Sequence, residues 1–135
     1  MSQSVPAMLL NEPDEEGRRG VVINTSSDAT YDGSGPQTGY AGTKAGIIGL
    51  TLPASRTVAG KGIRINTIVG GGFDTPILEG YSSPEAIAIF ATQFPSPQRL
   101  GRPEEFARFA AHIAENGYIN SAALRIDAGY RIQMA

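Results

Sequence analysis

Three short apolar runs stand out along the chain, separated by longer segments of mixed character. They are residues 20–25 (Gly-Val-Val-Ile-Asn-Thr), 62–69 (Gly-Ile-Arg-Ile-Asn-Thr-Ile-Val) and 122–126 (Ala-Ala-Leu-Arg-Ile). The first two are rich in β-branched residues. Continuous runs of this kind are typical of strands buried on both faces, as in parallel sheets. We therefore predict three β-strands at these positions.

The segment between the first two runs has helical periodicity from about residue 38 to residue 59. Four glycines interrupt it on one stripe, namely Gly39, Gly42, Gly46 and Gly49. Each costs about 1 kcal/mol against alanine in a helix interior, and Pro53 should kink or locally open the helix. The stripe indicates that another backbone lies against it. This backbone is either a strand of the same subunit or a partner's helix, and the sequence does not favour one over the other. Ser55 is expected on the helix surface.

Breaker residues place the loops. Glycine and proline indicate a loop over residues 26–37 and another over residues 73–82. The three glycines at 70–72 indicate a flexible turn after the second strand. A phosphate cradle is the less favoured interpretation of these glycines, because no helix follows at once and no lysine completes the motif.

Two further helices are expected before the third strand. Ser83 as N-cap and Pro84 at the first helical position open one helix that runs to about Gln93. A second helix runs from Pro103 to Glu115. Its apolar face consists of Phe106, Phe109, Ala110 and Ile113. The order strand, helix, strand, helices, strand, with right-handed crossovers, predicts an α/β fold with a three-layer parallel sheet.

Composition excludes several classes of protein. The 135 residues suffice for one domain, and the net charge of −2 offers no electrostatic footprint for nucleic acid or an anionic membrane. No cysteine is present, which excludes disulfides and thiolate chemistry, and the single histidine, His112, excludes a multi-histidine metal site. No apolar run approaches the roughly 20 residues of a membrane span, and the N-terminus lacks leader features. A soluble cytoplasmic protein that holds no metal is expected.

The candidate chemistry lies at Ser27, Tyr40 and Lys44. Residues four apart on a helix stand on the same face, so Lys44 sets a positive charge close to the phenol of Tyr40. A nearby ammonium favours the phenolate form, which suits a general acid/base. Ser27, at the end of the preceding strand, is placed to hydrogen-bond the same reacting oxygen. These residues predict a proton-transfer site for interconverting an alcohol and a ketone.

In order and spacing, these residues resemble the C-terminal half of the short-chain dehydrogenase/reductase family. The segments that carry the resemblance are 22–27 (Val-Ile-Asn-Thr-Ser-Ser), Tyr40-x-x-x-Lys44, 62–66 (Gly-Ile-Arg-Ile-Asn) and 73–76 (Phe-x-Thr-Pro). The similarity is closest to the branch of type-2 3-hydroxyacyl-CoA and hydroxysteroid dehydrogenases. Its cues include residues 49–53 (Gly-Leu-Thr-Leu-Pro) and 94–103 (Phe-Pro-Ser-Pro-Gln-Arg-Leu-Gly-Arg-Pro).

The resemblance implies an oxidoreductase that uses NAD, with NADP not excluded, on a 3-hydroxyacyl-CoA or hydroxysteroid-like alcohol. It implies that Tyr40 exchanges a proton with the substrate oxygen and that Ser27 holds that oxygen. It also implies that Tyr40 and Lys44 bind the cofactor, Lys44 through the nicotinamide ribose hydroxyls. Phe73 and Thr75 would contact the nicotinamide end of the cofactor, and residues 74–98 would cover the substrate.

The sequence also departs from the family. Its N-terminal half, a glycine-rich strand–turn–helix that holds the pyrophosphate, is not found, so residues 1–135 are interpreted as a single partial Rossmann-fold domain. Gly70 stands where the family usually has proline, and Asp28 where it usually has a small or apolar residue. These departures leave an alternative open, a truncated or split chain that is catalytically inactive. The strand at 20–25 would then have an unpaired edge, which predicts a homo-oligomer or association with a complementing dehydrogenase chain.

Overall fold

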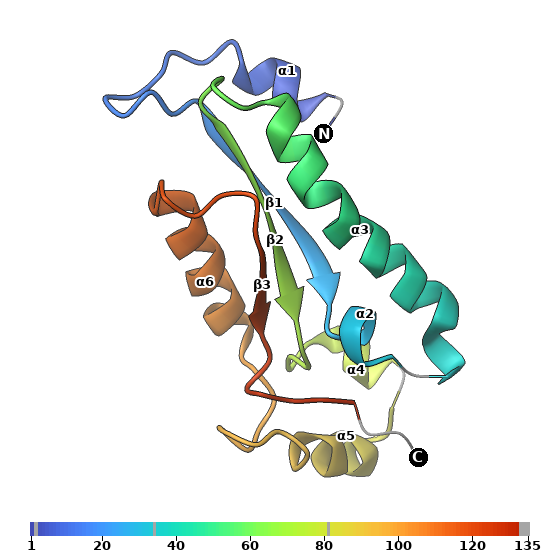
Figure 1. The fold of residues 1–135 in the computed structure, drawn as a ribbon. Helices are drawn as coiled ribbons and strands as arrows, with labels where there is room; N and C mark the ends of the chain where they lie inside the picture. Colours follow the sequence, from blue (N-terminus) through green and yellow to red (C-terminus); the bar gives the residue numbers. More distant parts are fainter. Residues whose placement is uncertain (2, 34, 81, 133–135) are drawn as a thin grey trace.

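The structure of the chain is a computed structural model that describes residues 1, 3–33, 35–80 and 82–132. Its centre is a three-stranded parallel sheet in the order β1-β2-β3 (Figure 1). The strands are β1 (Gly20–Ser27), β2 (Ile63–Gly70) and β3 (Ala123–Ile126). The three strand predictions are therefore confirmed, with boundaries that move by one or two residues. β1 pairs with β2 from Gly20 opposite Ile63 to Ser27 opposite Gly70.

Two long helices cover the sheet. α3 (Thr38–Thr57) packs against β1 and β2 on one side, and α6 (Pro103–Glu115) packs against the same strands from the other (Figure 1). This arrangement confirms the three-layer α/β prediction. α3 continues through Pro53 as one helix, and the bounds of α6 match those predicted from the sequence. No helix among the described residues is long and apolar enough to cross a membrane.

The strands differ in burial according to their place in the sheet. Every residue of β2 is buried, because the strand has a neighbour on each side and a helix on each face. β1 is only half-buried before its last two residues, so the prediction of a strand buried on both faces was wrong for most of its length. The physical reason is that β1 is an edge strand, paired only with β2 within the described part of the chain. The predicted unpaired edge is confirmed.

The short elements correct the loop predictions. Residues 26–37 are not a simple loop, because β1 extends to Ser27 and is followed by the single-turn helix α2 (Ala29–Asp32) and a 3₁₀ turn (Gly35–Gln37). Asp28 starts α2, since its carboxylate accepts the backbone N–H of Ala29 at 2.8 Å. One-turn α4 (Pro76–Glu79) likewise lies inside the predicted loop at 73–82.

The remaining helices are short. α1 (Ser4–Met8) precedes β1, and α5 (Pro84–Ala91) lies beyond β2. The predicted N-cap of α5 is confirmed, because the Ser83 hydroxyl accepts the N–H of Ala86 at 3.3 Å.

Among the residues that the structure describes, nothing packs against the glycine stripe of α3. A Cβ atom added at any of its four glycines would meet nothing within 4 Å. The prediction that a strand of the same subunit lies against the stripe was therefore wrong. α3 instead faces the sheet with Thr51 and Ser55, both buried, and Thr51 Oγ1 lies 2.6 Å from Thr67 Oγ1 of β2. Ser55, expected on the surface, bonds to Ser121 before β3.

Candidate active site

The predicted site residues follow the carboxyl ends of the parallel strands or begin the next helix. β1 ends at Ser27, β2 at Gly70 and β3 at Ile126, and all three ends meet at one edge of the sheet. Ligands of open α/β sheets bind at this edge, because the segments that leave the strands there are free to vary. The chain therefore gathers its candidate chemistry where the fold supports it.

Tyr40 and Lys44 stand together on the first turns of α3. The Lys44 Nζ atom lies 5.7 Å from the centroid of the Tyr40 ring, and the Tyr40 side chain is 48% exposed. Two hydrogen bonds also join Lys44 to the end of β1. Its Nζ donates to the Thr25 carbonyl at 3.1 Å, and the Ser26 hydroxyl donates to the Lys44 carbonyl at 2.8 Å. An ammonium has three hydrogens, so donors remain for a ligand beside the phenol.

The hydroxyl group of Ser27 bonds to its own neighbours in the chain. Its hydroxyl donates to Asp28 Oδ1 at 3.0 Å and accepts the backbone N–H of Ala29 at 3.2 Å. Both Ser27 and Asp28 are buried. Among the described residues, no hydrogen bond joins Ser27 to Tyr40. The structure thus brings Tyr40 and Lys44 together, whereas the hydroxyl of Ser27 is hydrogen-bonded to the Asp28 carboxylate.

Asp28 is a buried acid at the end of β1. Burial raises the pKa of its carboxyl group above the usual range, and the nearby carboxylate of Asp32 acts in the same direction. Hydrogen bonds from Ser27 and from the Ala29 N–H, and the charge of Arg125, oppose this rise in the pKa. The sequence marked Asp28 only as a departure from the family and did not predict its hydrogen bond with Ser27.

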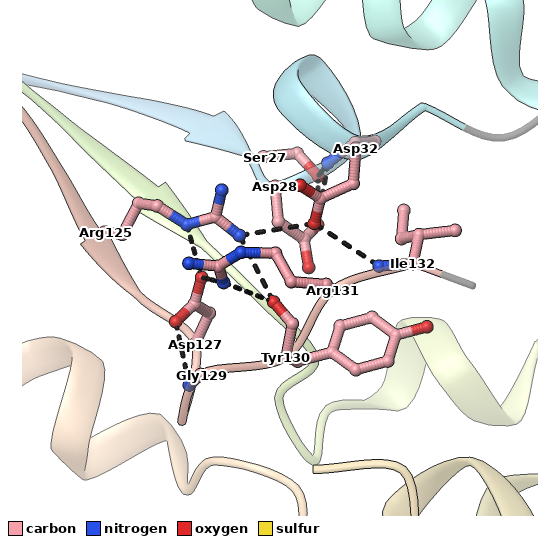
Figure 2. Close-up of polar contacts among 10 residues, drawn as sticks. Ser27, Asp28, Asp32, Arg125, Asp127, Gly129, Tyr130, Arg131 and Ile132 are labelled. Carbon is pink, nitrogen blue, oxygen red and sulfur yellow. Dashed lines mark hydrogen bonds and ion pairs between the residues drawn. The ribbon is translucent and has the colours of Figure 1, made fainter. Parts of the chain in front are cut away.

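A network of charges lies beside Asp28 and was not predicted. Figure 2 shows the side chain of Arg125, a residue of β3, between two carboxylates. Its guanidinium donates to Asp127 and, at 3.3 Å, to Asp32. Arg131 donates to Asp127 at 3.2 Å, and the backbone N–H of Ile132 reaches Asp32 at 3.3 Å. These contacts fasten the segment after β3 to α2. The sequence did not predict these pairs, because contacts between distant elements leave no periodic signal.

The glycines after β2 are required by close packing. A Cβ atom at Gly71 would lie 2.7 Å from the Cβ of Asp127, and one at Gly72 would lie 2.7 Å from the Phe94 ring. A larger residue at either position would have to displace its neighbour. The prediction of a flexible turn was therefore incomplete, since the turn is held against the segment after β3 and the end of α5.

Phe73 and Thr75 form the next part of the rim. The Phe73 ring meets the Phe106 ring of α6 edge-on, with centroids 5.5 Å apart. Thr75 is half-buried, precedes α4, and donates from its hydroxyl to the Phe73 carbonyl at 3.4 Å. Their predicted contact with a cofactor stays a prediction, because these contacts are all within the chain.

A cavity of about 140 Å³ opens beside Phe73. Phe94 lines it together with Arg99 and Glu105, which form a two-point ion pair at 2.7 and 2.8 Å. The Arg99 guanidinium and the backbone N–H of Arg102 hold the pKa of Glu105 at about 2. Because both charges are satisfied by each other, this pair ties the start of α6 to the segment that precedes it.

Comparisons with known proteins identify relatives of this chain. Residues 4–131 match the family model described as enoyl-(acyl carrier protein) reductase. The chain is 46% identical over 124 residues to the 3-hydroxyacyl-CoA dehydrogenase type-2 of Homo sapiens, covering 91% of this chain and 47% of that protein. It is 43% identical over 130 residues to the enzyme of the same name from Drosophila melanogaster, covering 96% and 50%.

A solved structure is similar over nearly the whole chain. The crystal structure of 3-hydroxyacyl-CoA dehydrogenase type-2 from Mycobacterium avium superimposes with a TM-score of 0.90 at 46% identity, covering 98% of this chain and 51% of that one. The chain thus spans about half the length of the relatives it matches.

Proposed function

Because this chain belongs to the short-chain dehydrogenase/reductase family, we propose that it carries the proton-transfer half of an oxidoreductase that interconverts a secondary alcohol and a ketone. The observation that supports this proposal most directly is the position of Lys44. Its ammonium lies over the Tyr40 ring and donates to the Thr25 carbonyl, and the Ser26 hydroxyl holds the Lys44 backbone carbonyl at the end of β1. A charge fixed in this way is already oriented when a substrate arrives.

In the proposed reaction, Tyr40 takes the proton of the alcohol, or returns it to the ketone. Its half-exposed phenol is accessible to a substrate, and the ammonium of Lys44 lies over the same ring. Ser27 would hold the reacting oxygen from the end of β1. The charge and the hydroxyl groups supply position and electrostatics, and none of them carries the redox chemistry.

The residues present fit one end of a nicotinamide dinucleotide. When bound, such a cofactor supplies the hydride chemistry. The donors left on Lys44 suit the ribose hydroxyls, and Phe73 and Thr75 on the rim would flank the ring. We propose NAD, with NADP as the other candidate, because the residue that tells the two apart lies outside the matched motifs. Among the described residues, no glycine-rich strand-to-helix turn precedes β1 to hold the pyrophosphate.

The proposed substrate is a 3-hydroxyacyl-CoA or a hydroxysteroid-like alcohol. The names of the similar proteins motivate the first class. Helices α4 and α5 lie in the segment at 74–98 that the resemblance assigns to covering the substrate. Their partly exposed apolar side chains, among them Ile77 and Ile89 at 65% each, suit an acyl chain or a steroid ring better than a small polar alcohol.

A second candidate function is favoured by a separate observation. The free edge of β1 and the open glycine stripe of α3 are both surfaces that a further chain would cover. On this proposal the chain is catalytically inactive alone and associates with itself or with another dehydrogenase chain that binds the pyrophosphate.

Cofactor titration separates the two candidates. NADH fluorescence is measured against the purified chain, with acetoacetyl-CoA turnover followed in parallel and chain assembly followed by light scattering. Micromolar binding with turnover by the chain alone supports the first candidate and contradicts the second. Millimolar or weaker binding without turnover supports the second, because the lost pyrophosphate contacts cost several kcal/mol. Tyr40→Phe is the matched control, which should abolish turnover while NADH binding through Lys44 persists.

A further inference from the structure

The segment that follows β3 lies between the strand ends and α5. Figure 1 shows residues 127–132 crossing the carboxyl edge of the sheet, with α2 on one side and α5 on the other. Resting on the proposed function, we propose that Asp32 is a positioning residue for substrates with long acyl chains. It fixes residues 127–132, on which α5 packs, and so sets the position of the helix that covers the acyl chain.

The first half of this link is polar and joins the segment to α2. The carboxylate of Asp32, at the end of α2, accepts hydrogen bonds from the Arg125 guanidinium and from the backbone N–H of Ile132, both at 3.3 Å (Figure 2). These two donors bracket the segment, so one carboxylate holds both of its ends. Arg125 also donates to the Tyr130 carbonyl at 3.3 Å, and the Tyr130 N–H donates to the Asp127 carbonyl at 2.9 Å. The segment is therefore closed on itself as well as fastened to α2.

The second half is aromatic and joins the same segment to α5. The Tyr130 ring stacks on Phe94 with centroids 4.7 Å apart, and meets Phe90 of α5 edge-on at 5.5 Å. Its hydroxyl donates to the side chain of Gln93 at 3.3 Å. Tyr130 is 6% exposed and Phe94 is 1% exposed. Buried aromatic pairs in these geometries attract each other beyond the effect of burial alone, so the end of α5 is fixed to Tyr130.

The apolar cluster around these rings is held to the sheet from its edge. Phe94, Leu100 and Tyr130 form its centre, and none of its described members belongs to a strand. Gly72, after β2, lies against the rings, since a Cβ atom there would lie 2.7 Å from Phe94 and 2.8 Å from Phe90. That contact is apolar and has no preferred direction, whereas hydrogen bonds need a defined geometry. Asp32 therefore provides the directional hold on α5.

The same helix turn also carries the partner of Ser27. α2 begins after Asp28, which bonds to the Ser27 hydroxyl, and it ends at Asp32. One turn of helix thus joins the proposed holder of the reacting oxygen to the anchor of α5. In a 3-oxoacyl-CoA the reacting oxygen and the acyl tail belong to one molecule. A long tail extends to the exposed apolar side chains of α4 and α5, such as Ile77 and Ile89, whereas acetoacetyl-CoA has only a methyl group beyond the reacting carbon.

The anchoring of α5 is tested without turnover, by hydrogen exchange of backbone amides measured by mass spectrometry. Asp32→Ala removes the acceptor of both hydrogen bonds, so residues 84–93 should exchange at least about tenfold faster, as expected for the loss of bonds to a charged group. Exchange in α6 should not change. Glu115→Gln, which alters an exposed carboxylate at the end of α6, is the control and should leave α5 unaffected. Equal exchange of α5 in Asp32→Ala and the unmodified chain would overturn the proposal.

A second variant covers the case in which Asp32→Ala unfolds the chain, which fast exchange in every helix would reveal. Tyr130→Leu keeps the ion pair between Arg125 and Asp32 and removes the ring stack at the other end of the link. It should speed exchange in α5 and leave α6 unchanged. Unchanged exchange of α5 in Tyr130→Leu would likewise overturn the proposal.

The role in substrate choice is tested on the chain together with whichever partner co-purifies. NADH-dependent reduction of 3-oxodecanoyl-CoA and of acetoacetyl-CoA is measured at one pH. In Asp32→Ala, the ratio of kcat/KM for the long substrate to that for the short one should fall about tenfold, chiefly through the KM of the long substrate. Lost contacts to about two methylene groups suffice for such a change. Asp32→Asn keeps an acceptor oxygen and should restore most of the ratio.

Two results would count against the role in substrate choice. An equal loss of kcat/KM for both substrates in Asp32→Ala would assign Asp32 a structural role only. Absence of turnover in every protein would overturn the proposed function, and the role in substrate choice with it, whereas the exchange experiment decides by itself whether Asp32 anchors α5.

Discussion

The two helices that cover the sheet complete their contacts to different degrees. The apolar face of α6 is buried around Ile113, and its C-terminal carbonyls at Ile113 and Ala114 accept hydrogen bonds from the guanidinium of Arg64 at 2.8 and 2.6 Å. α3 meets the sheet through small polar residues and exposes its glycine stripe. The comparison teaches that α6 anchors itself to the sheet within this chain through Ile113 and Arg64, whereas the glycine stripe of α3 is a surface that nothing in the described residues covers.

The largest expected difference between α6 and α3 is the loss of unfolding free energy when a large apolar side chain is truncated to alanine. Ile113→Ala should lower the free energy of unfolding by about 2–5 kcal/mol, because Ile113 is 0% exposed and the lost methyl groups leave a cavity. Leu52→Ala on α3 is the matched change, and at 44% exposure it should cost only about 0.5 kcal/mol. Urea unfolding followed by circular dichroism measures both. Equal losses would show that the two helices are equally packed.

The effect of a glycine substitution on stability should have opposite signs at α6 and at α3. Gly101→Ala, before α6, places a Cβ atom 2.6 Å from the Phe73 ring and should cost about 1–3 kcal/mol. Gly46→Ala on α3 meets open space and should gain about 0.5–1 kcal/mol through helix propensity. Thermal unfolding gives both values. If the chain associates through the stripe, Gly46→Leu should reduce assembly size without lowering the stability of the monomer. Destabilisation of the monomer would place a same-chain neighbour at Gly46.

A smaller, pH-dependent effect is expected at the start of α6. The Arg99 guanidinium lowers the pKa of Glu105 from 4.5 to about 2, so its stabilising effect is present above 4.5 and is lost as the pH falls toward 2. Glu105→Gln should therefore be less stable than the wild type near neutral pH, with the difference closing in acid. Urea unfolding at several pH values measures this. Glu104→Gln, on the same helix turn, is the control for loss of an exposed carboxylate, and a matching pH dependence in it would contradict the role of the Arg99 pair.

The pH dependence of stability is expected to have the opposite sign at Asp28, which follows β1. Burial raises its pKa above the ordinary value of 3.8, so the folded state favours the protonated acid. That contribution to stability is present below 3.8 and is lost as the pH rises through the folded-state pKa. Asp28→Asn should therefore be more stable than the wild type at neutral pH and equal to it in acid. A variant that is less stable at neutral pH would show that the charge itself holds the start of α2.

Elements with strong local signals were predicted well. α6 has proline at its first position and a glutamate two residues later whose carboxylate accepts the Arg102 N–H at 2.7 Å, so its bounds follow from neighbouring residues alone. The first two strands were found for the same reason, because a continuous β-branched run needs no partner to be recognised. The spacing of Tyr40 and Lys44 along one helix face likewise predicted that the two side chains would meet, as they do.

The errors fall where distant segments decide the outcome. The half-burial of β1 depends on its place at the edge of the sheet, and the open space beside the glycine stripe depends on which face of α3 turns to β2. α2 was missed because the cap that starts it is a single carboxylate, Asp28, in a stretch of turn-forming residues. None of these features leaves a periodic pattern in the sequence.

The sequence by itself determined the strands, the long helices, the family and the pairing of Tyr40 with Lys44, because each follows from residue types at short, fixed spacings. Only the tertiary structure decided which hydroxyl and carboxylate share a hydrogen at the end of β1, and which surfaces stay uncovered. Those outcomes depend on burial and on contacts between segments up to a hundred residues apart, such as that of Asp32 with Ile132. Local spacing carries no information about either.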